Sequence, residues 1–266
     1  MPFHQFGSLR YFCFQSLENL GVMHAAITRR GGVSPAPWDS LNVGGTVGDE
    51  SSRVSENRLR AISTIHRPLE SLFDVWQVHG DRVVVANTPR PPGQAHIQAD
   101  AILTNKPDVT LFMRFADCVP VFLFDPGKQV IGLAHAGWLG TVQRIAGHAV
   151  RTMEERFGSH PADVVAGIGP SIAAHHYPVG PEVARQVSSA FGDKAGLLLV
   201  PVEEDHPDSR VQFDLWEANR LVLEQSGVQQ IEISGMCTAC HTSDWYSHRG
   251  EKGKTGRFGA LLALPR

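Results

Sequence analysis

The protein has 266 residues, and its 24 Lys+Arg against 27 Asp+Glu give a formal net charge of −3. This near balance argues against a general nucleic-acid binder, which needs a basic excess or stripe. Four cysteines are too few for a disulfide scaffold at this length, so we expect reduced thiols and a cytoplasmic protein. The N-terminal segment lacks signal-peptide features, and no apolar run approaches the roughly 18–20 residues that cross a bilayer, so no membrane association is expected.

Short apolar runs rich in β-branched and aromatic residues predict strands, and apolar residues spaced three and four apart predict helices. Because the strands come in runs and do not alternate strictly with helices, the pattern favours an α+β fold with mixed β-sheets layered with helices. The only obvious spacer, Asn87–Gly93, is short, so residues 1–266 are interpreted as one domain. In chain order, we expect strand 22–28, helix 51–65, strands 83–86, 101–104, 110–115, 119–124 and 130–134, helix 141–157, strand 164–168, helix 214–226 and strand 231–234.

Local signals sharpen three of these elements. Asp125-Pro126-Gly127-Lys128 has the chemistry of a turn, which predicts a hairpin between strands 119–124 and 130–134. Thr141 is the expected N-cap of the helix that follows, and Gly158 its C-terminal stop. The helix near the C-terminus is expected to open on Asp214 and to close before Gly227.

Three segments each place a metal-competent side chain at a strand end or turn, namely His79, Cys118 and His135. If the hairpin forms, antiparallel pairing brings Cys118 and His135 side by side, whereas His79 must arrive from elsewhere in the fold. One thiolate and two imidazoles suit Zn²⁺ with a fourth position left open, which is typical of catalytic sites. From spacing alone, a buried cysteine with two hydrogen-bonded core histidines explains the same residues equally well.

At these motifs the chain resembles the YfiH-type laccase-domain family, also called multicopper polyphenol oxidase-like. The resemblance spans nearly the whole sequence and implies zinc ligands at His79, Cys118 and His135. The stretches that carry it, in order, are Thr28–Ser34, Ser40–Asn42, Gln77–Gly80, Ala99–Ala101, Ala116–Pro120, His135–Trp138, Gly167–Ile172 and Thr255–Gly259.

The resemblance implies phosphorolysis of adenosine, inosine, guanosine and methylthioadenosine, and deamination of adenosine. The expected partners are therefore purine nucleosides and phosphate. A zinc-activated water can attack C6 of adenine, and phosphorolysis needs a cationic pocket that holds phosphate in line with the ribose C1′. Cys118, His135 and Asp117 are the expected catalytic residues, although Asp117 can equally serve only to fix its turn.

Five further residues are candidates for substrate contact. Arg29, in a Gly-rich turn, and Arg249 are candidates for the phosphate, and surface loop roles explain either one about as well. Asn42 and Gln77 can hydrogen-bond the base or ribose, with structural turn roles equally open. Ser247, in the Tyr246-Ser247-His248-Arg249 segment, completes the predicted set.

Three departures from the family pattern bear on this prediction. Leu139 stands where Arg is usual, and Gly250 replaces the second Arg of an Arg-Arg pair. Two missing cations put phosphate affinity in more doubt than metal binding. His175-His176-Tyr177 stands where a Cys commonly precedes the Tyr.

Other readings of the motifs stay open. Cys237-Thr238-Ala239-Cys240-His241 matches the pattern of c-type haem attachment, but a structural or site-lining role is favoured, with Cys240 a small buried residue. Cys13 is expected to be inert in an apolar strand. The site can hold Cu²⁺ as well as Zn²⁺, but the paired His-x-His segments of multicopper centres are missing from the sequence.

Two alternatives concern the site as a whole. Cys118 and His135 can form the nucleophile–base pair of a Cys–His hydrolase or amidase, which would not need His79. A non-enzymatic binding module stabilised by zinc would instead have four protein ligands and no open position.

Overall fold

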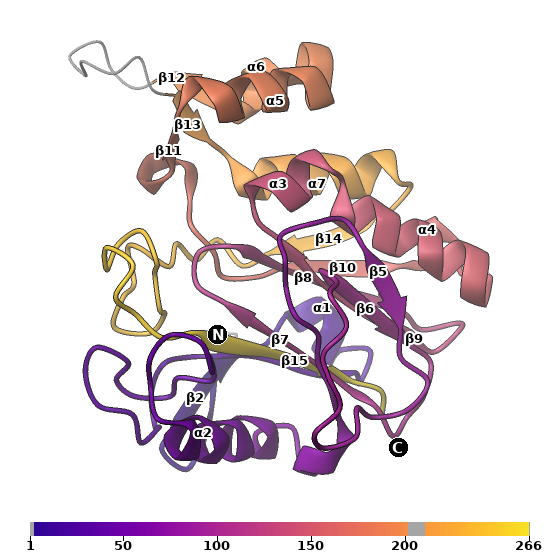
Figure 1. Ribbon diagram of the computed structural model, residues 1–266. Helices are drawn as coiled ribbons and strands as arrows, with labels where there is room; N and C mark the ends of the chain where they lie inside the picture. The colour runs from indigo at the N-terminus through magenta and orange to yellow at the C-terminus, as the bar shows by residue number, and fades with distance from the viewer. Residues whose placement is uncertain (1–2, 202–210, 266) are drawn as a thin grey trace.

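The computed structural model describes residues 3–201 and 211–265 and consists of two large β-sheets stacked face to face, with helices on both outer surfaces (Figure 1). The expected α+β class with mixed sheets is confirmed. The helices are α1 Gln15–Glu18, α2 Ser51–Ser63, α3 Trp138–Val142, α4 Ile145–Phe157, α5 Pro181–Phe191, α6 Ala195–Leu198 and α7 Leu215–Gln225. The strands are β1 Phe3–Phe6, β2 Leu9–Phe12, β3 Met23–Ile27, β4 Leu72–Phe73, β5 Val83–Val85, β6 Ala101–Thr104, β7 Thr110–Phe115, β8 Val119–Asp125, β9 Val130–Ala136, β10 Val165–Ile168, β11 Pro178–Val179, β12 Leu199–Pro201, β13 Val211–Phe213, β14 Gln230–Ile233 and β15 Phe258–Ala263.

The first large sheet has the strand order β1-β2-β3-β15-β7-β4. Its centre is β15, which comes from the C-terminal end of the chain and pairs antiparallel with both β3 and β7. The residue just before it, Arg257, is thereby held beside segments from the first half of the sequence.

The second large sheet has the order β14-β10-β8-β9-β6-β5. Parallel pairs (β10 with β14, β5 with β6) flank the antiparallel β8–β9 hairpin, so the sheet is mixed. The chain passes from the first sheet to the second through the short turn between β7 and β8, which contains Asp117 and Cys118.

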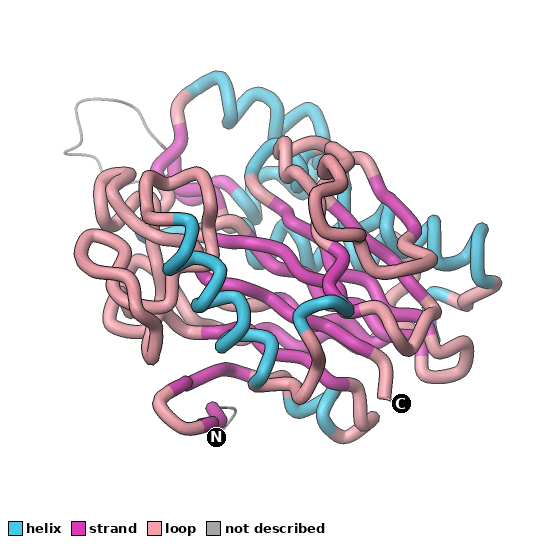
Figure 2. The backbone as a smooth tube through the Cα atoms, turned by 60° about the horizontal axis from the view of Figure 1, so that its bottom comes forward, coloured by secondary structure: helices cyan, strands magenta, loops and turns pink. Residues whose placement is uncertain are grey.

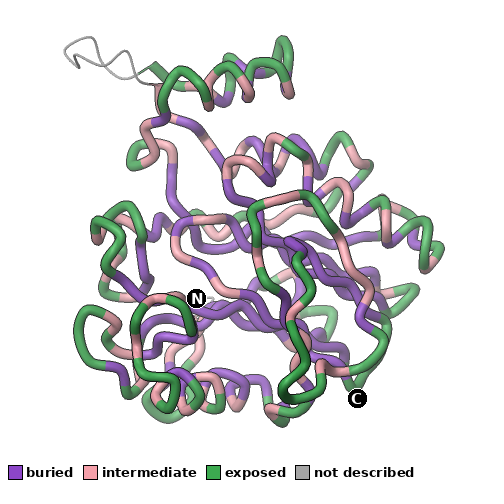
Figure 3. The backbone as a smooth tube through the Cα atoms, viewed as in Figure 1, coloured by how far each residue is buried: buried purple, intermediate pink, exposed green. Residues whose placement is uncertain are grey.

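Three apolar cores match this layering. One lies between the two sheets and contains residues of both, such as Met113 of β7 and Phe122 of β8. A second contains residues of the second sheet, α4 and α7, and a third contains residues of the first sheet and α2. Figure 2 shows the helices (cyan) outside the layered strands (magenta). Figure 3 shows the central strands, such as β8, β9 and β15, buried and the helices partly exposed.

At one end of the molecule, α5 and α6 lie with a small sheet of order β11-β13-β12. Its residues Val179 and Phe213 belong to the same core as α4 and α7, which joins this part to the rest. No helix in the described ranges is long and apolar enough to cross a membrane.

Two of the three predicted helices agree well with the structure. The predicted helix 51–65 is α2, and Asp214 caps α7 by accepting a hydrogen bond from the backbone N–H of Glu217 at 3.0 Å. The third prediction is wrong at its N-terminus, because Arg144 adopts φ 63° and divides the segment into α3 and α4. Thr141 therefore lies inside α3 and not at a helix start, whereas Gly158 does end α4 with a left-handed φ of 69°.

The predicted strands are all present, with ends shifted by one or two residues. The short strands β1, β2, β4, β11, β12 and β13 escaped prediction, as did β15 and the helix α5. The shortest of these, β4 and β11, have two residues each and carry too little alternation to be distinguished from a loop.

A cavity that contains a Cys/His cluster

A cavity of about 660 Å³ lies where the turn between the two large sheets meets loops from both ends of the chain. This volume is in the range of small-molecule sites. Its lining combines arginines, histidines and aromatic rings: Gly44, Gly45, Thr46, Arg58, Trp76, Gln77, His79, His96, Arg114, Ala116, Asp117, Cys118, His135, Trp138, Tyr177, His248, Arg249 and Arg257.

The β8–β9 hairpin brings Cys118 and His135 together, as predicted. Val119 pairs with Ala136 and Pro120 with His135, so Cys118, one residue before β8, lies beside the end of β9. Cys118 is half-buried and His135 is 3% exposed. These two side chains are therefore held by the most extensively paired part of the second sheet.

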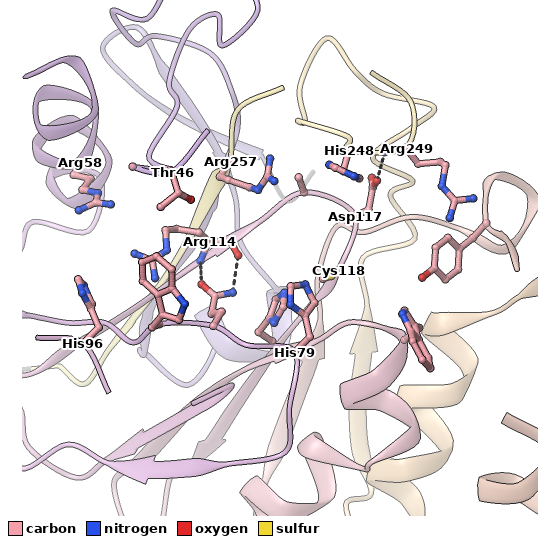
Figure 4. Close-up of a pocket in the computed structure, with 18 residues that line it drawn as sticks. Thr46, Arg58, His79, His96, Arg114, Asp117, Cys118, His248, Arg249 and Arg257 are labelled. Atoms are coloured by element: carbon pink, nitrogen blue, oxygen red, sulfur yellow. Dashed lines mark hydrogen bonds between the residues drawn. The ribbon is translucent and has the colours of Figure 1, made fainter. Parts of the chain in front are cut away.

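His79 reaches the same point from the loop between β4 and β5. The ligand atoms of His79, Cys118 and His135 all lie within 4.8 Å of one another, and the two imidazole rings are 4.8 Å apart, centre to centre. All three line the cavity, and Figure 4 shows His79 beside Cys118. His79 adopts φ 61°, and Asp117 adopts φ 80°; both are costly conformations for non-glycine residues and are typical of functional sites.

Asp100 orients both histidines. Its carboxylate accepts a hydrogen bond from the backbone N–H of His79 at 2.9 Å and interacts with Nδ1 of His135 at 2.9 Å. The backbone N–H groups of Val78 and Gly80 donate to the same carboxylate at 3.1 and 2.8 Å. With Nδ1 held in this way, His135 presents Nε2 to the cluster, and a carboxylate behind a ligating histidine is the usual second layer of a metal site.

The electrostatics of the Cys118–His135 pair favour its charged form. Burial alone would raise the pKa of the Cys118 thiol, but the charge of His135 and hydrogen bonds from both histidines lower the pKa. Burial likewise opposes ionisation of His135, whereas the Cys118 thiolate and Asp100 raise its pKa. A thiolate is the form that binds a metal or acts as a nucleophile.

The donor set fits a Zn²⁺ ion. One thiolate and two imidazoles are three of the four ligands of a tetrahedral zinc site with one open position. Gly137 keeps this space free, because a Cβ at that position would lie 3.0 Å from Cys118 Sγ and 3.2 Å from His79 Cδ2. The same three side chains also suit Cu²⁺, and the geometry does not separate the two metals.

Asp117 is next to the cluster, but its oxygens are already engaged. They accept hydrogen bonds from the hydroxyls of Thr238 and Ser247, both at 2.7 Å, and from the backbone N–H of Arg249 at 2.6 Å (Figure 4). The carboxylate is 7% exposed and ties the cavity turn to the C-terminal loops. This geometry supports the turn-fixing role for Asp117.

Three of the predicted substrate contacts lie outside the cavity lining. The Arg29 guanidinium is bound to Glu251 and to the carbonyls of Asp39 and Thr242. Asn42 and Ser247 are fully buried and hydrogen-bonded within the protein. Each of these polar groups already has a partner, so each supports the loops around the cavity.

The other two, Gln77 and Arg249, do line it. The Gln77 amide is fixed from both sides by the backbone of Arg114, whose N–H donates to it at 2.9 Å and whose carbonyl accepts from it at 2.8 Å. The Arg249 guanidinium lies 5.0 Å from the centre of the Tyr177 ring and donates to the carbonyl of Pro178.

Sequence reasoning missed the arginines that the fold gathers at the cavity, Arg58, Arg114 and Arg257. Arg114 is paired with Asp74 at 3.0 Å. Within residues 3–201 and 211–265, no carboxylate lies at ion-pair distance from Arg58 or Arg257. Burial, together with the positive charges of Arg114 and Arg90, lowers the pKa of Arg58, and burial lowers that of Arg257.

Figure 4 shows Arg58, Thr46 and Arg257 on one side of the cavity. Asn42 positions this side: its Oδ1 accepts hydrogen bonds from the backbone N–H groups of Gly44 and Arg257, both at 2.9 Å. The Thr255–Gly259 motif contained Arg257 and offered a signal for it. Arg58 had none, because it sits in an ordinary amphipathic helix.

Neither Leu139 nor Gly250, the two positions at which the resemblance implies an arginine, lines the cavity. Gly250 donates its N–H to Ser247 Oγ at 2.9 Å, and a Cβ at Gly250 would lie 3.0 Å from that oxygen. Leu139 lies in α3 and outside the cavity lining. The arginines at 58, 249 and 257 supply positive charge from other elements.

The remaining cysteines behave differently from one another. Cys13 is buried, and burial raises the pKa of its thiol, which fits the expected inert role. Its expected place in a strand is wrong, because β2 ends at Phe12. The expectation that Cys240 is buried is wrong, because it lies on an exposed turn, while Cys237 is the buried member of the pair. All four thiols are free.

Comparison with known proteins places this site in a family. Residues 23–265 match the family model described as multi-copper polyphenol oxidoreductase laccase. The chain is 38% identical over 255 residues to "Purine nucleoside phosphorylase YlmD" of Bacillus subtilis, covering 93% of this chain and 90% of that protein. It is 39% identical over 248 residues to "Purine nucleoside phosphorylase" of Deinococcus radiodurans, covering 93% and 91%.

Solved structures agree. The crystal structure of YlmD from Geobacillus stearothermophilus superposes with a TM-score of 0.90 at 32% identity, over 100% of this chain and 99% of that one. The Bacillus licheniformis protein YfiH gives a TM-score of 0.88 at 32% identity, over 99% of each chain. The chain therefore belongs to the multi-copper polyphenol oxidoreductase laccase family, whose relatives include the YfiH- and YlmD-type proteins.

Proposed function

We propose that this protein is a cytoplasmic purine nucleoside phosphorylase that holds Zn²⁺ at His79, Cys118 and His135. The observation that carries the proposal is one cavity lined both by the His79, Cys118 and His135 cluster and by Arg58 and Arg257, which have no carboxylate at ion-pair distance in the part of the chain that the structure describes. The names of the relatives support the same reaction class. We treat residues 1–266 as one functional domain.

The cavity residues divide the work of phosphorolysis. Arg58 and Arg257 hold phosphate, because an oxyanion gains most from cations that burial has already stripped of water. Trp76, Trp138 and Tyr177 provide aromatic faces for the purine. With nucleoside and phosphate held together, the nucleophile meets the ribose C1′ in a fixed orientation.

The His79, Cys118 and His135 cluster acts on the base or the ribose of the nucleoside. When bound, Zn²⁺ supplies a Lewis acid at the open position of this ligand set. Cys118 and His135 hold that position on a rigid hairpin, and Asp100 keeps the imidazole of His135 aimed at it. Asp117 and Asn42 act as positioning residues for Arg249 and Arg257.

Adenosine deamination is the second candidate, and the open coordination position favours it. A three-ligand zinc site with a neighbouring cavity is the arrangement that hydrolytic deaminases use at C6 of adenine. This reaction does not require phosphate. Incubation of adenosine with and without phosphate therefore separates the two, since deamination yields inosine and phosphorolysis yields adenine and ribose-1-phosphate.

The copper oxidase and Cys–His hydrolase readings are testable alternatives. An oxidase would consume oxygen with a phenolic substrate after copper loading. A hydrolase would use Cys118 and His135 but not His79, so His79→Ala would leave thiol reactivity and turnover intact. The convergence of His79 on the other two ligand atoms favours the metal site.

The direct test is inosine turnover with phosphate, compared between wild type and Arg257→Met. Loss of a charge-assisted contact worth about 1.5–3 kcal/mol should raise KM for phosphate by roughly 10–100-fold, with a smaller change in KM for inosine. Arg53→Met, on the exposed part of α2, is the matched control and should behave like wild type. A rate of inosine turnover that does not depend on the phosphate concentration, or no nucleoside turnover at all, would overturn the proposal.

A further inference from the structure

A second cluster of metal-binding side chains lies apart from the cavity lining. It consists of His175, His176, Cys237 and Cys240, whose ligand atoms all lie within 4.8 Å of one another. The four residues come from two segments that are more than sixty positions apart in the sequence. Neither a short-range motif nor the proposed reaction accounts for their meeting.

The backbone brings the two segments together at a defined register. Ser171 forms a β-bridge with Cys237: its N–H donates to the carbonyl of Met236, and the N–H of Thr238 donates back to Ser171, both at 3.1 Å. Three residues beyond Ser171, the chain forms the short 3₁₀ turn Ala174–His176. The cluster therefore rests on paired backbone and not on a chance contact between side chains.

The distances between ligand atoms suit one tetrahedral ion. With Zn–N of about 2.05 Å and Zn–S of about 2.3 Å, tetrahedral geometry separates nitrogen and sulfur by about 3.6 Å. His176 Nδ1 lies 3.5 Å from Cys240 Sγ and 3.6 Å from Cys237 Sγ. His175 Nε2 lies 3.1 Å from Cys240 Sγ, half an ångström closer than this geometry requires, and both side chains are exposed.

The chemistry of the set is also that of a structural zinc site. Two thiolates and two imidazoles complete a tetrahedron and leave no open position, and Cys237 and Cys240 have the Cys-x₂-Cys spacing common in such sites. The backbone N–H of Ala173 points at Cys237 Sγ at 3.4 Å, which is the kind of hydrogen bond that supports a ligating thiolate.

We propose that His175, His176, Cys237 and Cys240 bind a second, structural Zn²⁺ that fastens one wall of the cavity. Tyr177, which lines the cavity and faces Arg249, directly follows His176. Thr238, which donates to Asp117, directly follows Cys237. A shared ion would couple these two segments, so the wall becomes more rigid without any cluster residue reaching the substrate.

Zinc content of the full-length protein tests this proposal. Protein purified in reductant, stripped with chelator and reloaded with Zn²⁺ should retain two equivalents per chain by mass spectrometry of the metal. Cys240→Ser and His175→Ala should each lose one equivalent, and His79→Ala should lose the other. His241→Ala is the matched control, because His241 is exposed beside Cys240 but outside the cluster, and it should retain both.

The nature of the second site can be read spectroscopically. His79→Ala protein loaded with Co²⁺ should show the intense visible bands of tetrahedral cobalt with thiolate charge transfer, and Cys240→Ser should remove them in this background. Zinc at ten times its dissociation constant for the second site should raise the Tm of His79→Ala by about 3–5 °C. It should not raise the Tm of the double variant His79→Ala/Cys240→Ser.

Unchanged zinc content in Cys240→Ser, or a disulfide between Cys237 and Cys240 in the reductant-purified protein, would overturn the second site. Failure of the first site is distinguishable, since the protein would then hold one equivalent that depends on Cys240 and not on His79.

Discussion

The two Cys/His clusters of this protein use the same ligand types in contrasting settings. The cavity cluster has three ligands, one of them from a buried strand of the β8–β9 hairpin, and a carboxylate behind its histidines. The second cluster has four ligands on two turns, and three of them are exposed. The two clusters therefore differ both in the number of ligands and in their burial, although both consist of histidine and cysteine side chains.

The difference shows how the setting assigns a role to a ligand set. Three rigid ligands beside a cavity leave room for a substrate atom, which is what catalysis at a metal requires. Four ligands on turns satisfy the ion completely and can only hold chain segments together. Two variants separate the clusters and a third separates both clusters from the cavity wall, beginning with the variant of largest expected effect.

Cys118→Ser should abolish the function of the cavity cluster. A serine hydroxyl is a weak ligand compared with a thiolate, and loss of several kcal/mol of metal-derived stabilisation corresponds to about a thousandfold lower kcat/KM. One zinc equivalent should disappear while the Cys240-dependent equivalent stays. His241→Ala is again the control, because this exposed side chain belongs to no group of metal-competent side chains among the described residues. Retention of full activity by Cys118→Ser would contradict the assignment.

Asp100→Asn should weaken the same cluster without removing a ligand. Replacement of the carboxylate behind a ligating histidine typically costs about 10–100-fold in metal affinity or activity. Competition titration with a chromophoric chelator measures the affinity, and only the His79-dependent equivalent should weaken. Asp81→Asn, an exposed residue in the β4–β5 loop that carries His79, should match wild type. An equal loss of zinc affinity at both sites would show that Asp100 stabilises the fold in general.

Asp74→Asn should disturb the cavity wall and leave both clusters loaded. Asp74 binds Arg90 and Arg114 at 2.7 and 3.0 Å, and the loss of such charged hydrogen bonds should lower the free energy of unfolding at pH 7 by about 2 kcal/mol. Zinc content should not change. A loss of zinc from either cluster would show that the Asp74 contacts also support metal binding, and would contradict this prediction.

The same variant has a defined pH dependence. Burial would raise the pKa of Asp74, but Arg114, Arg90 and His96 hold it below its ordinary value. A carboxyl whose pKa is lower in the folded protein stabilises the fold at pH values above its pKa in the unfolded chain, about 3.9. This stabilisation is lost as the pH falls through the pKa of the folded protein. The gap between wild type and Asp74→Asn should therefore narrow below about pH 4 in urea unfolding, and a constant gap would refute this origin.

Local signals in the sequence determined much of the framework. Apolar alternation and the Asp125–Lys128 turn located the β8–β9 hairpin, and that hairpin alone placed Cys118 beside His135. Helical spacing and the Asp214 cap located α7 within a residue. The donor types then indicated zinc chemistry. These features depend on residues close together in the chain, so periodicity and turn chemistry suffice to predict them.

Tertiary structure decided everything that depended on distant segments. It brought His79 to the hairpin, held it there through Asp100, and inserted β15 between β3 and β7 so that Arg257 faces the cavity. It also placed Arg29, Asn42 and Ser247 outside the cavity lining, in hydrogen bonds with the surrounding loops, and it gathered the second cluster from two turns. Pairing across long loops is fixed by the whole set of packed layers, which no local pattern encodes.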